Sequence, residues 1–302
     1  MYAASLIVPI WERWRVAFWC LHKVGLGYFL VPVRAHVAEL ADACGSGPHG
    51  ATLGGSNPLV STSDSLFFIV ASILSQTDPE FVRSTFSSIS KRYDFANHLL
   101  SGGLDYYWRY RVARKVARLS PRRILDLATG SGDLAIALKK ACPLAAVTAA
   151  DFCLPMLNQA RLKGVTRLVQ ADALALPFAD ASFDVVTVAF GLRNMASWPE
   201  ALREMARVLE PGGTVLILDF SLPSWGFFRN IYRFYLHKIL PLIAGWATKR
   251  PAAYEYLGES IESFPSGMVM NALMASCGFS CEPSLPLTGG IVSLYCGKTK
   301  DD

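Results

Sequence analysis

Residues 124–133, which read ILDLATGSGD, have the clearest potential for ligand chemistry. An apolar run enters a turn that contains Gly130 and Gly132, and a helix-like segment follows it. Glycine lets a backbone bend sharply and approach a ligand closely. The stretch therefore predicts a ligand-binding loop between a strand and a helix. The spacing from Gly130 to Ala135 also matches the nicotinamide dinucleotide fingerprint, so the glycines alone do not identify the ligand.

Acidic side chains around this loop discriminate between the candidate ligands. Asp126 precedes the glycines, Asp133 follows them, and Asp151 ends the next predicted strand, where a ribose-binding carboxylate is needed. Carboxylates on both sides of the loop would repel a pyrophosphate. They favour a ligand with positive sulfonium and ammonium groups, so the sequence predicts S-adenosylmethionine as the cofactor. The structural alternative is a glycine turn with a helix-capping aspartate.

A further acidic residue follows the predicted strand at 168–170. Asp172 can accept a hydrogen bond from the adenine amino group, and the backbone N–H of Ala173 can bind a ring nitrogen. Asp180 and Asp184 fit turn and strand-entry positions with structural roles.

The elements that must position these residues alternate between short apolar strands and amphipathic helices. Alternation of this kind predicts an α/β fold with a doubly wound, mostly parallel sheet and helices on both faces. Near the carboxyl end, a helix and two late strands joined by a Pro/Gly-rich turn predict a terminal hairpin on the sheet edge. The predicted strands are 124–127, 146–150, 168–170, 183–190, 214–219 and 289–296, with a further strand from 278, and the predicted helices are 109–119, 132–141, 156–163, 198–209 and 268–277.

The first 76 residues differ from the rest, since neither a helical nor a strand period holds across them. Residues 36–65 resemble the conceptual translation of a transfer-RNA gene. We therefore expect residues 1–76 to be an N-terminal extension that is either disordered or lies upstream of a true start near Leu74. Mass spectrometry of the native N-terminus that finds peptides from before Ser63 would refute the second interpretation.

Composition limits the class of protein. Lys and Arg are scattered, apart from residues 229–250, which argues against a nucleic-acid binder despite the net charge of +5. The seven cysteines include no CxxC pair, and we expect reduced thiols and no metal site. Hydrophobic residues make up 52% of the chain, so membrane contact must be considered, although the apolar run at 16–33 is too interrupted to span a bilayer.

Residues 222–250 interleave aromatic and basic side chains and are too long for a plain connection. This pattern is typical of an apolar groove or of a helix at a membrane surface. A homodimer contact and a buried cap are the alternatives. We expect residues 222–265 to cover the active site of a cytoplasmic protein that contacts the inner face of the cytoplasmic membrane.

Three blocks of residues resemble the ubiquinone/menaquinone C-methyltransferase family (UbiE type) among the class I methyltransferases. The resemblance extends from about residue 78 to residue 298. The glycine loop is generic to methyltransferases, whereas the first two blocks together are specific to this family. The blocks are FSSISKRYDFANHLLS at 86–101 with Trp108 after it, FGLRN at 190–194, and RVLEPGGTVLILDFS at 207–221.

This resemblance implies a seven-stranded sheet whose last strand is antiparallel, in a methyltransferase domain at 77–300 with a helical lid at 77–119. It implies methyl transfer to a ring carbon of a reduced polyprenyl quinone precursor, either demethylmenaquinol or the benzoquinol of ubiquinone synthesis. The alternatives are another small lipid or phenolic acceptor, a non-catalytic binding subunit, and a nicotinamide oxidoreductase. The expected cofactor-binding residues are Asp126, Gly130, Ser131, Gly132, Asp151, Asp172, Ala173 and Ala189.

Some residues depart from the family pattern. Ala189 replaces a common serine, so it can contact the cofactor only through its backbone or by packing. Asp105 stands where histidine is common, which bears on how the lid closes. Ala96 and Glu210 replace a usual methionine and lysine.

Methyl transfer to a hydroquinone carbon needs alignment of two centres, a base, and a positive group beside the phenolate. We expect Arg193 to hold the phenolate, because a guanidinium keeps its charge at neutral pH. Asn194 can orient the other oxygen or a water, and Tyr93 is the expected third contact. His98 is an alternative base, although a lone helical histidine is more often packed or solvated. A turn with Arg193 paired to a surface carboxylate is the structural alternative.

Overall fold

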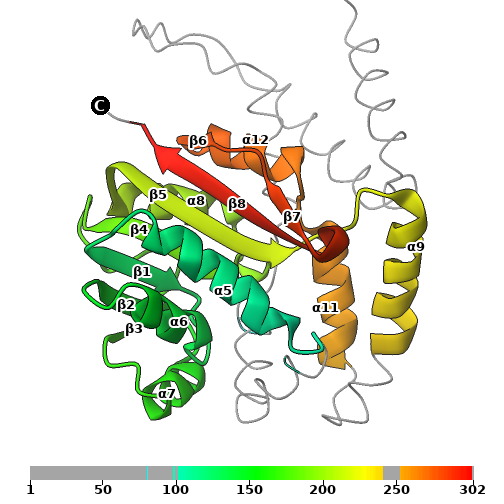
Figure 1. The fold of residues 1–302 in the computed structure, drawn as a ribbon, viewed down its shortest axis with the longest axis horizontal. Coiled ribbons are helices and arrows are strands. Elements are labelled where there is room, and N and C mark those ends of the chain that lie inside the picture. Colours follow the sequence, from blue (N-terminus) through cyan, green and yellow to red (C-terminus); the bar gives the residue numbers. More distant parts are fainter. Residues whose placement is uncertain (1–79, 81–97, 99–100, 241–251, 301–302) are drawn as a thin grey trace, which may run out of the picture. The chain divides into compact units, whose positions relative to one another are not determined.

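The computed structural model describes residues 80, 98, 101–240 and 252–300, with side chains omitted for 252–256 (Figure 1). The expected N-terminal extension at 1–76 and Tyr93 lie outside the described residues. Within the described ranges, no helix has the length and apolar character that crossing a membrane requires.

The predicted α/β fold with a mostly parallel sheet is confirmed. The order of the strands is β3-β2-β1-β4-β5-β8-β6, and β7 also pairs with β8. Strands β1 to β5 are parallel, whereas β8 is antiparallel to β5. The strands are β1 (Arg123–Leu127), β2 (Ala146–Asp151), β3 (Leu168–Gln170), β4 (Phe183–Ala189), β5 (Leu209–Phe220), β6 (Phe279–Cys281), β7 (Leu285–Leu287) and β8 (Val292–Thr299).

The sheet has eight strands where seven were expected. The extra strand arises because β6 and β7 pair with successive parts of the same β8 edge: Cys281 lies opposite Gly297, and Leu285 lies opposite Leu294. Pro283, between the two strands, has no N–H to donate to a ladder. The strand predicted from 278 is β6, which pairs antiparallel with β8 as the predicted terminal hairpin requires, and β7 is an additional strand within the predicted turn.

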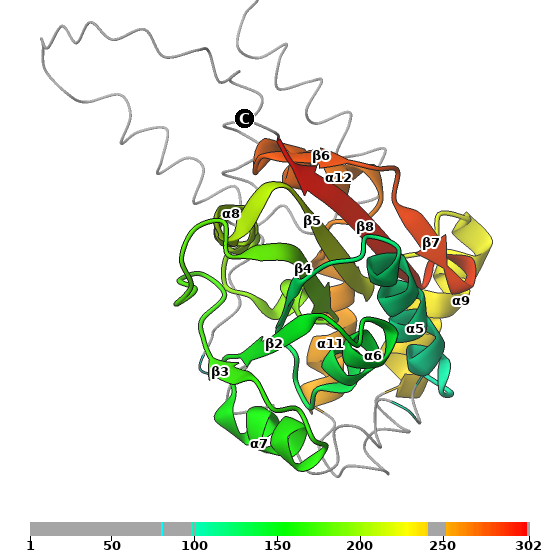
Figure 2. The same cartoon turned by 60° about the vertical axis from the view of Figure 1, so that its left-hand side comes forward.

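Helices cover both faces of the sheet (Figures 1 and 2). α5 (Leu104–Ala117) and α6 (Asp133–Ala141) share one apolar cluster with Ile124 and Val185, whereas α8 (Trp198–Val208) and α12 (Met268–Ser276) share the other with Leu125 and Val186. α7 (Leu154–Leu162) contacts β2 and β3. Because consecutive residues of β1 and β4 face opposite apolar layers, their sequences are continuously hydrophobic, as expected for parallel strands.

The chain after β5 forms helices beyond the carboxyl end of that strand. These are α9 (Gly226–Phe234), the π-helix η2 (Tyr235–Ile239) and α11 (Ala252–Ser263). Figure 1 shows α9 beside α11, and η2 contacts α11 as well. Tyr232, Leu236 and Ile261 belong to a separate small apolar cluster, against which Phe220 packs. This part of the predicted aromatic and basic insertion is therefore anchored to the end of β5.

Two boundaries differ from those that the sequence pattern predicts. α5 begins at Leu104, five residues before the predicted start at 109, so it also includes Asp105 and Trp108. β5 begins at Leu209 and continues through the Pro-Gly-Gly at 211–213, which a propensity argument assigns to a turn.

Candidate active site

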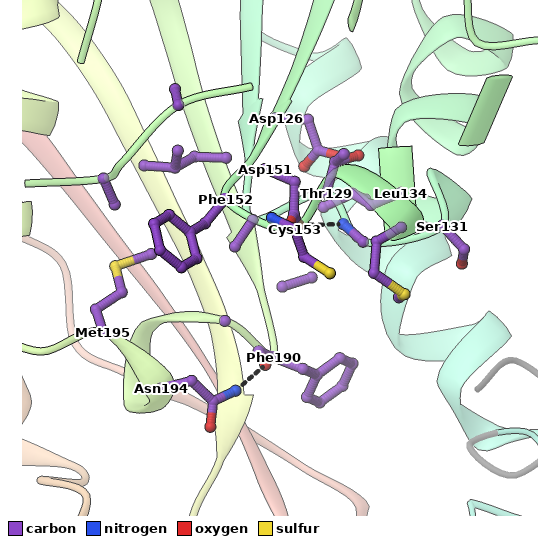
Figure 3. A pocket seen from close by; sticks show the side chains of 18 of the residues that line it. Asp126, Thr129, Ser131, Leu134, Asp151, Phe152, Cys153, Phe190, Asn194 and Met195 are labelled. Atoms are coloured by element: carbon purple, nitrogen blue, oxygen red, sulfur yellow. Dashed lines mark hydrogen bonds between the residues drawn. The ribbon is translucent and has the colours of Figure 1, made fainter. Parts of the chain in front are cut away.

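A pocket opens at the carboxyl ends of β1, β2 and β4 (Figure 3). Strand order reverses between β1 and β4, and doubly wound sheets bind their ligands at such a point. Most of the residues predicted from the sequence meet here. Those that line the pocket are Asp126, Gly130, Ser131, Asp151, Asp172, Ala173, Ala189 and Asn194.

The two loop glycines have different roles. Gly130 has a φ of +57°, and its N–H donates to Asp151 Oδ2 at 2.8 Å, so it joins the ends of β1 and β2. Gly132 has a φ of +86° and does not line the pocket. A Cβ on Gly132 would lie 2.8 Å from Val165 Cγ2 and 3.0 Å from Ala160 Cβ. Gly132 therefore lets the loop approach α7 closely.

Asp126, the penultimate residue of β1, is a fully buried carboxylate at the pocket wall. It accepts hydrogen bonds from Thr129 Oγ1 at 2.6 Å and Thr187 Oγ1 at 2.8 Å. Burial raises the pKa of Asp126 to about 6, against the opposing effect of the two hydroxyls. The residue is mostly ionised at neutral pH, and a nearby cation would stabilise that form.

Asp151 is held rigidly at the end of β2. Its Oδ2 accepts from the N–H of Gly130 and its Oδ1 from the N–H of Cys153, both at 2.8 Å. Burial raises the pKa of Asp151. Each carboxylate oxygen has a second lone pair, which leaves capacity to accept from a ligand hydroxyl.

The charge of Asp133 acts on a bound ligand less strongly than the sequence pattern suggests. Lys163 Nζ lies 2.5 Å from Asp133 Oδ1 and also donates to Ser131 Oγ at 3.1 Å. This cation, thirty residues away along the chain, offsets the charge of Asp133 at the start of α6. The negative potential of the pocket therefore depends mainly on the buried Asp126 and the half-buried Asp151.

Asp172 and Ala173 lie in the turn after β3, also on the pocket wall. Asp172 Oδ1 accepts from the N–H of Leu174 at 2.9 Å, and Asp172 forms an isolated bridge with Ala175. These contacts fix the turn and keep one edge of the Asp172 carboxylate available to the pocket.

Arg193 lies outside the pocket lining, in the short 3-10 helix η1 (Leu192–Asn194) after β4. Its Nη1 donates to Asp219 Oδ1 at 2.7 Å and to the carbonyl oxygen of Phe190 at 2.6 Å. Asp219 is completely buried, so the partner of Arg193 is a core carboxylate and not a surface one. Arg193 Nε is also buried and has no hydrogen-bond partner.

Asn194 does reach the pocket, and Figure 3 shows its Nδ2 directed to the carbonyl oxygen of Phe190, 3.4 Å away. His98 Nδ1 lies 2.7 Å from Asp105 Oδ2, and the His98 ring stacks on Tyr106. His98 is thus a packed residue in this structure, which is the alternative that the sequence analysis gave to a role as the base.

The pocket wall also contains residues that were not predicted as site residues from the sequence, among them Arg109 on α5 and Phe190 after β4. Phe190 has a φ of +60°, which is strained for an aromatic residue and is typical of functional sites. Its ring packs against Trp108 and Phe220, with centroid distances of 5.9 and 4.8 Å. The sequence signal for this inward face of α5 was the helical spacing of the apolar residues Trp108 and Val112, both of which are buried in the structure.

Comparisons with known proteins agree with this geometry. A methyltransferase of Haloferax volcanii, solved in complex with the Trm112 activator, matches with a TM-score of 0.52 at 19% identity and covers 73% of this chain and 98% of that one. A SAM-dependent methyltransferase of Thermotoga maritima matches with a TM-score of 0.51 at 18% identity over 72% and 99% of the two chains. The fold is therefore that of the class I methyltransferases.

Sequence relatives narrow this class. A demethylmenaquinone methyltransferase of Thermus thermophilus is 47% identical over 217 residues, which are 70% of this chain and 98% of the relative. The UbiE C-methyltransferase of Bdellovibrio bacteriovorus is 41% identical over 229 residues, 74% and 97% of the two chains. Residues 74–299 match the ubiE/COQ5 methyltransferase family. The chain belongs to the ubiE/COQ5 methyltransferase family.

Proposed function

We propose that this protein transfers the methyl group of S-adenosylmethionine to a ring carbon of a reduced polyprenyl quinone precursor, with demethylmenaquinol as the acceptor. The observation that carries this proposal is the pocket at the β1–β4 crossover, with the buried Asp126 and the half-buried Asp151, in a chain of the ubiE/COQ5 family. Three of the similar sequences are demethylmenaquinone methyltransferases of Thermus, Deinococcus and Mycobacterium species.

The residues present fit S-adenosylmethionine. Asp151 is positioned for the ribose hydroxyls, and Asp172 with the Ala173 N–H for the adenine edge. Asp126, whose ionised form a nearby cation would stabilise, suits the positive end of the molecule. When bound, the cofactor supplies an electrophilic methyl group on a sulfonium.

The chain's own residues would activate the acceptor. Asn194, on the pocket wall, can orient a ring oxygen or a water. Arg193 supplies a fixed positive charge behind Phe190, which would stabilise a phenolate on the acceptor. Asp219 holds the guanidinium in place. Tyr93, from the predicted lid, is the proposed third contact with the acceptor.

Product analysis tests this function. A strain that lacks this methylation should regain methylated menaquinone when it expresses the chain, and mass spectrometry of its quinones identifies the product. The purified protein should methylate demethylmenaquinol faster than the benzoquinol precursor. Methylation of an unrelated phenol or lipid in preference to both quinols would contradict the proposal.

Arg193→Gln tests the proposed role of the arginine. The variant should lower kcat while the Kd for S-adenosylhomocysteine is unchanged, because Arg193 lies outside the pocket lining. A variant that loses only thermal stability and keeps kcat would limit Arg193 to structural support through Asp219.

We further propose that α9 contacts the inner face of the cytoplasmic membrane, from which a polyprenyl quinol would be taken. Trp225, Phe227 and Phe234 on and before α9 are exposed by 73, 69 and 60%. Arg229 and Arg233 lie on the same helix, and aromatic and basic side chains together suit an anionic lipid surface. Lipid tails would accept the rings and lipid phosphates the guanidinium groups.

Co-sedimentation with vesicles of anionic phospholipid tests this contact. Replacing Trp225, Phe227 and Phe234 with serine should abolish binding to the vesicles and leave S-adenosylhomocysteine affinity unchanged. Loss of a homodimer in the same variant, with vesicle binding intact, would favour the alternative that α9 is a dimer contact.

A further inference from the structure

Negatively charged side chains outnumber positively charged ones in the lining of the pocket. In the described part of the chain the charged side chains are the carboxylates of Asp126, Asp133, Asp151 and Asp172, and a single cation, Arg109. S-adenosylmethionine carries a carboxylate in addition to its sulfonium and ammonium groups. Apart from Asp133, whose charge Lys163 offsets, these aspartates would repel that carboxylate, so the pocket needs a positive partner for it.

Arg109 is held as a preformed binding group. Its side chain is only 11% exposed, its Nη1 donates to Asp105, and its guanidinium carbon lies 5.6 Å from the centroid of the Phe190 ring. A guanidinium that is fixed in this way loses little conformational freedom when it binds a ligand.

Asp105 is itself fixed and ionised. It is 3% exposed, it accepts from Ser101 Oγ at 2.7 Å, and His98 Nδ1 lies 2.7 Å away. Burial opposes its ionisation, but the Ser101 hydroxyl and the charge of Arg109 together hold its pKa below the ordinary value. Asp105, the departure from the family pattern at this position, is thus a positioning residue for Arg109.

The place of Arg109 along the pocket favours the amino-acid end of the cofactor. Asp151 and Asp172, at the ends of β2 and β3, are proposed for the ribose and the adenine. The charge of Arg109 lowers the pKa of Asp126, which sits at the end of β1 on the far side of Asp151 from β3. Within the described residues Arg109 has one hydrogen-bonded partner, Asp105, so its other N–H groups are available to a ligand.

We propose that Arg109 binds the carboxylate of the methionine moiety of S-adenosylmethionine and of S-adenosylhomocysteine. This inference rests on the proposed function, which supplies the cofactor. It gives the acidic pocket its selectivity for a zwitterionic amino acid: the aspartates attract the positive groups, and Arg109 compensates the negative one.

Calorimetry with two ligands tests the proposal. The probes are S-adenosylhomocysteine and its decarboxylated analogue, S-adenosyl-3-thiopropylamine, which lacks only the carboxylate. The wild-type protein should bind the first about 10- to 100-fold more tightly, as expected for a charge-assisted contact. In Arg109→Gln this ratio should fall to about 1, through weaker binding of S-adenosylhomocysteine alone. Binding of the analogue then reports that the variant is folded.

Arg114→Gln is the matched control. Arg114 lies on the exposed face of the same helix and does not line the pocket. Arg114→Gln therefore removes the same charge away from the pocket and should keep the wild-type ratio. A ratio retained in Arg109→Gln, or an equal loss of both ligands in a folded variant, overturns the proposal. So does a rise in the KM for the quinol with the ratio intact, which would assign Arg109 to the acceptor.

Two outcomes separate this inference from the proposed function. If the wild-type protein binds both ligands equally well, the cofactor assignment stands and the role of Arg109 is wrong. If the wild-type protein binds neither ligand, the proposed function itself fails. If Arg109→Gln does not fold, Arg109→Lys replaces it in the test. Because lysine retains a cation, this variant should lower the affinity ratio in part. An unchanged ratio in Arg109→Lys overturns the proposal.

Discussion

Replacing Gly132 with alanine should destabilise the protein more than replacing any solvent-facing glycine of similar backbone angle. The φ of Gly132 is +86°, and an added Cβ would lie 2.8 Å from Val165 Cγ2 and 3.0 Å from Ala160 Cβ. A left-handed alanine costs about 1–2 kcal/mol, and overpacking adds about 1–3 kcal/mol. The free energy of unfolding should therefore fall by about 2–5 kcal/mol, a large part of the stability of a typical domain.

Gly164 provides the matched control for this prediction. Its φ is +92°, and no atom lies within 4 Å of an added Cβ. Gly164→Ala therefore carries the conformational cost without the steric one, and should lose only about 1–2 kcal/mol. The difference between the two variants isolates the close approach between the glycine loop and α7.

Urea unfolding followed by circular dichroism measures both variants, and calorimetry with S-adenosylhomocysteine reports the loop. Gly132→Ala should also lower the affinity for S-adenosylhomocysteine, because relief of the contact with Val165 displaces the loop that carries Gly130 and Ser131. Gly164→Ala should bind it normally. Equal destabilisation of the two variants, or an unchanged ligand affinity in Gly132→Ala, would refute the role assigned to Gly132.

Further predictions concern charges in and around the pocket. Because burial raises the pKa of Asp126 to about 6, the folded state holds a proton that the unfolded state loses near pH 4; stability should fall between about pH 4 and 6. Asp126→Asn should remove this fall in pH-dependent unfolding, and should remove the rise in cofactor affinity that ionisation of Asp126 brings over the same range. Arg193→Met should cost about 3–5 kcal/mol, since it strands the buried charge of Asp219; Arg193→Met combined with Asp219→Leu should be more stable than the single variant in urea unfolding, and no recovery would contradict the pairing. Lys163→Met should expose the charge of Asp133 and favour S-adenosylmethionine over the neutral S-adenosylhomocysteine by up to about 5-fold in Kd, since S-adenosylmethionine carries one more positive charge; an unchanged ratio would show that Asp133 does not influence the ligand.

The fold was predictable because its signals are local. Strand β1 and the glycine loop are encoded by consecutive residues, and the apolar run of β4 is buried on both faces, which gives a continuous hydrophobic pattern. The strand count was wrong for a local reason as well. β7 lies in the Pro/Gly-rich segment that the sequence pattern assigns to a turn, and its pairing with β8 makes this segment a strand.

The site was predicted in part, and the misses share a physical cause. Asp126 and Asp151 lie at the carboxyl ends of β1 and β2, and Asp172 lies just after β3, so the topology alone brings them together at the pocket. The pairing of Arg193 with Asp219, and of Asp133 with Lys163, joins residues 26 and 30 positions apart. Sequence spacing at such distances does not reveal which charges neutralise each other.

Close contact between two backbone segments is a second feature that the sequence does not reveal. A Cβ on Gly191 would lie 2.5 Å from the Cβ of Ala128, because the loops after β1 and β4 touch at the crossover. Both loops also contain a non-glycine residue with positive φ, Ala128 and Phe190. The sequence shows Gly191 only as part of a motif, whereas the structure supplies the steric reason for it.

The interrupted edge has a consequence for self-association. In the described part of the chain, one margin of the sheet is β3, with three residues, and the other consists of β6 and β7, with three residues each on either side of Pro283. A second copy that tried to add a strand at either margin would find few consecutive free N–H and C=O groups, and such short edges protect natural proteins from aggregation. Continuous sheets across two protomers are therefore disfavoured.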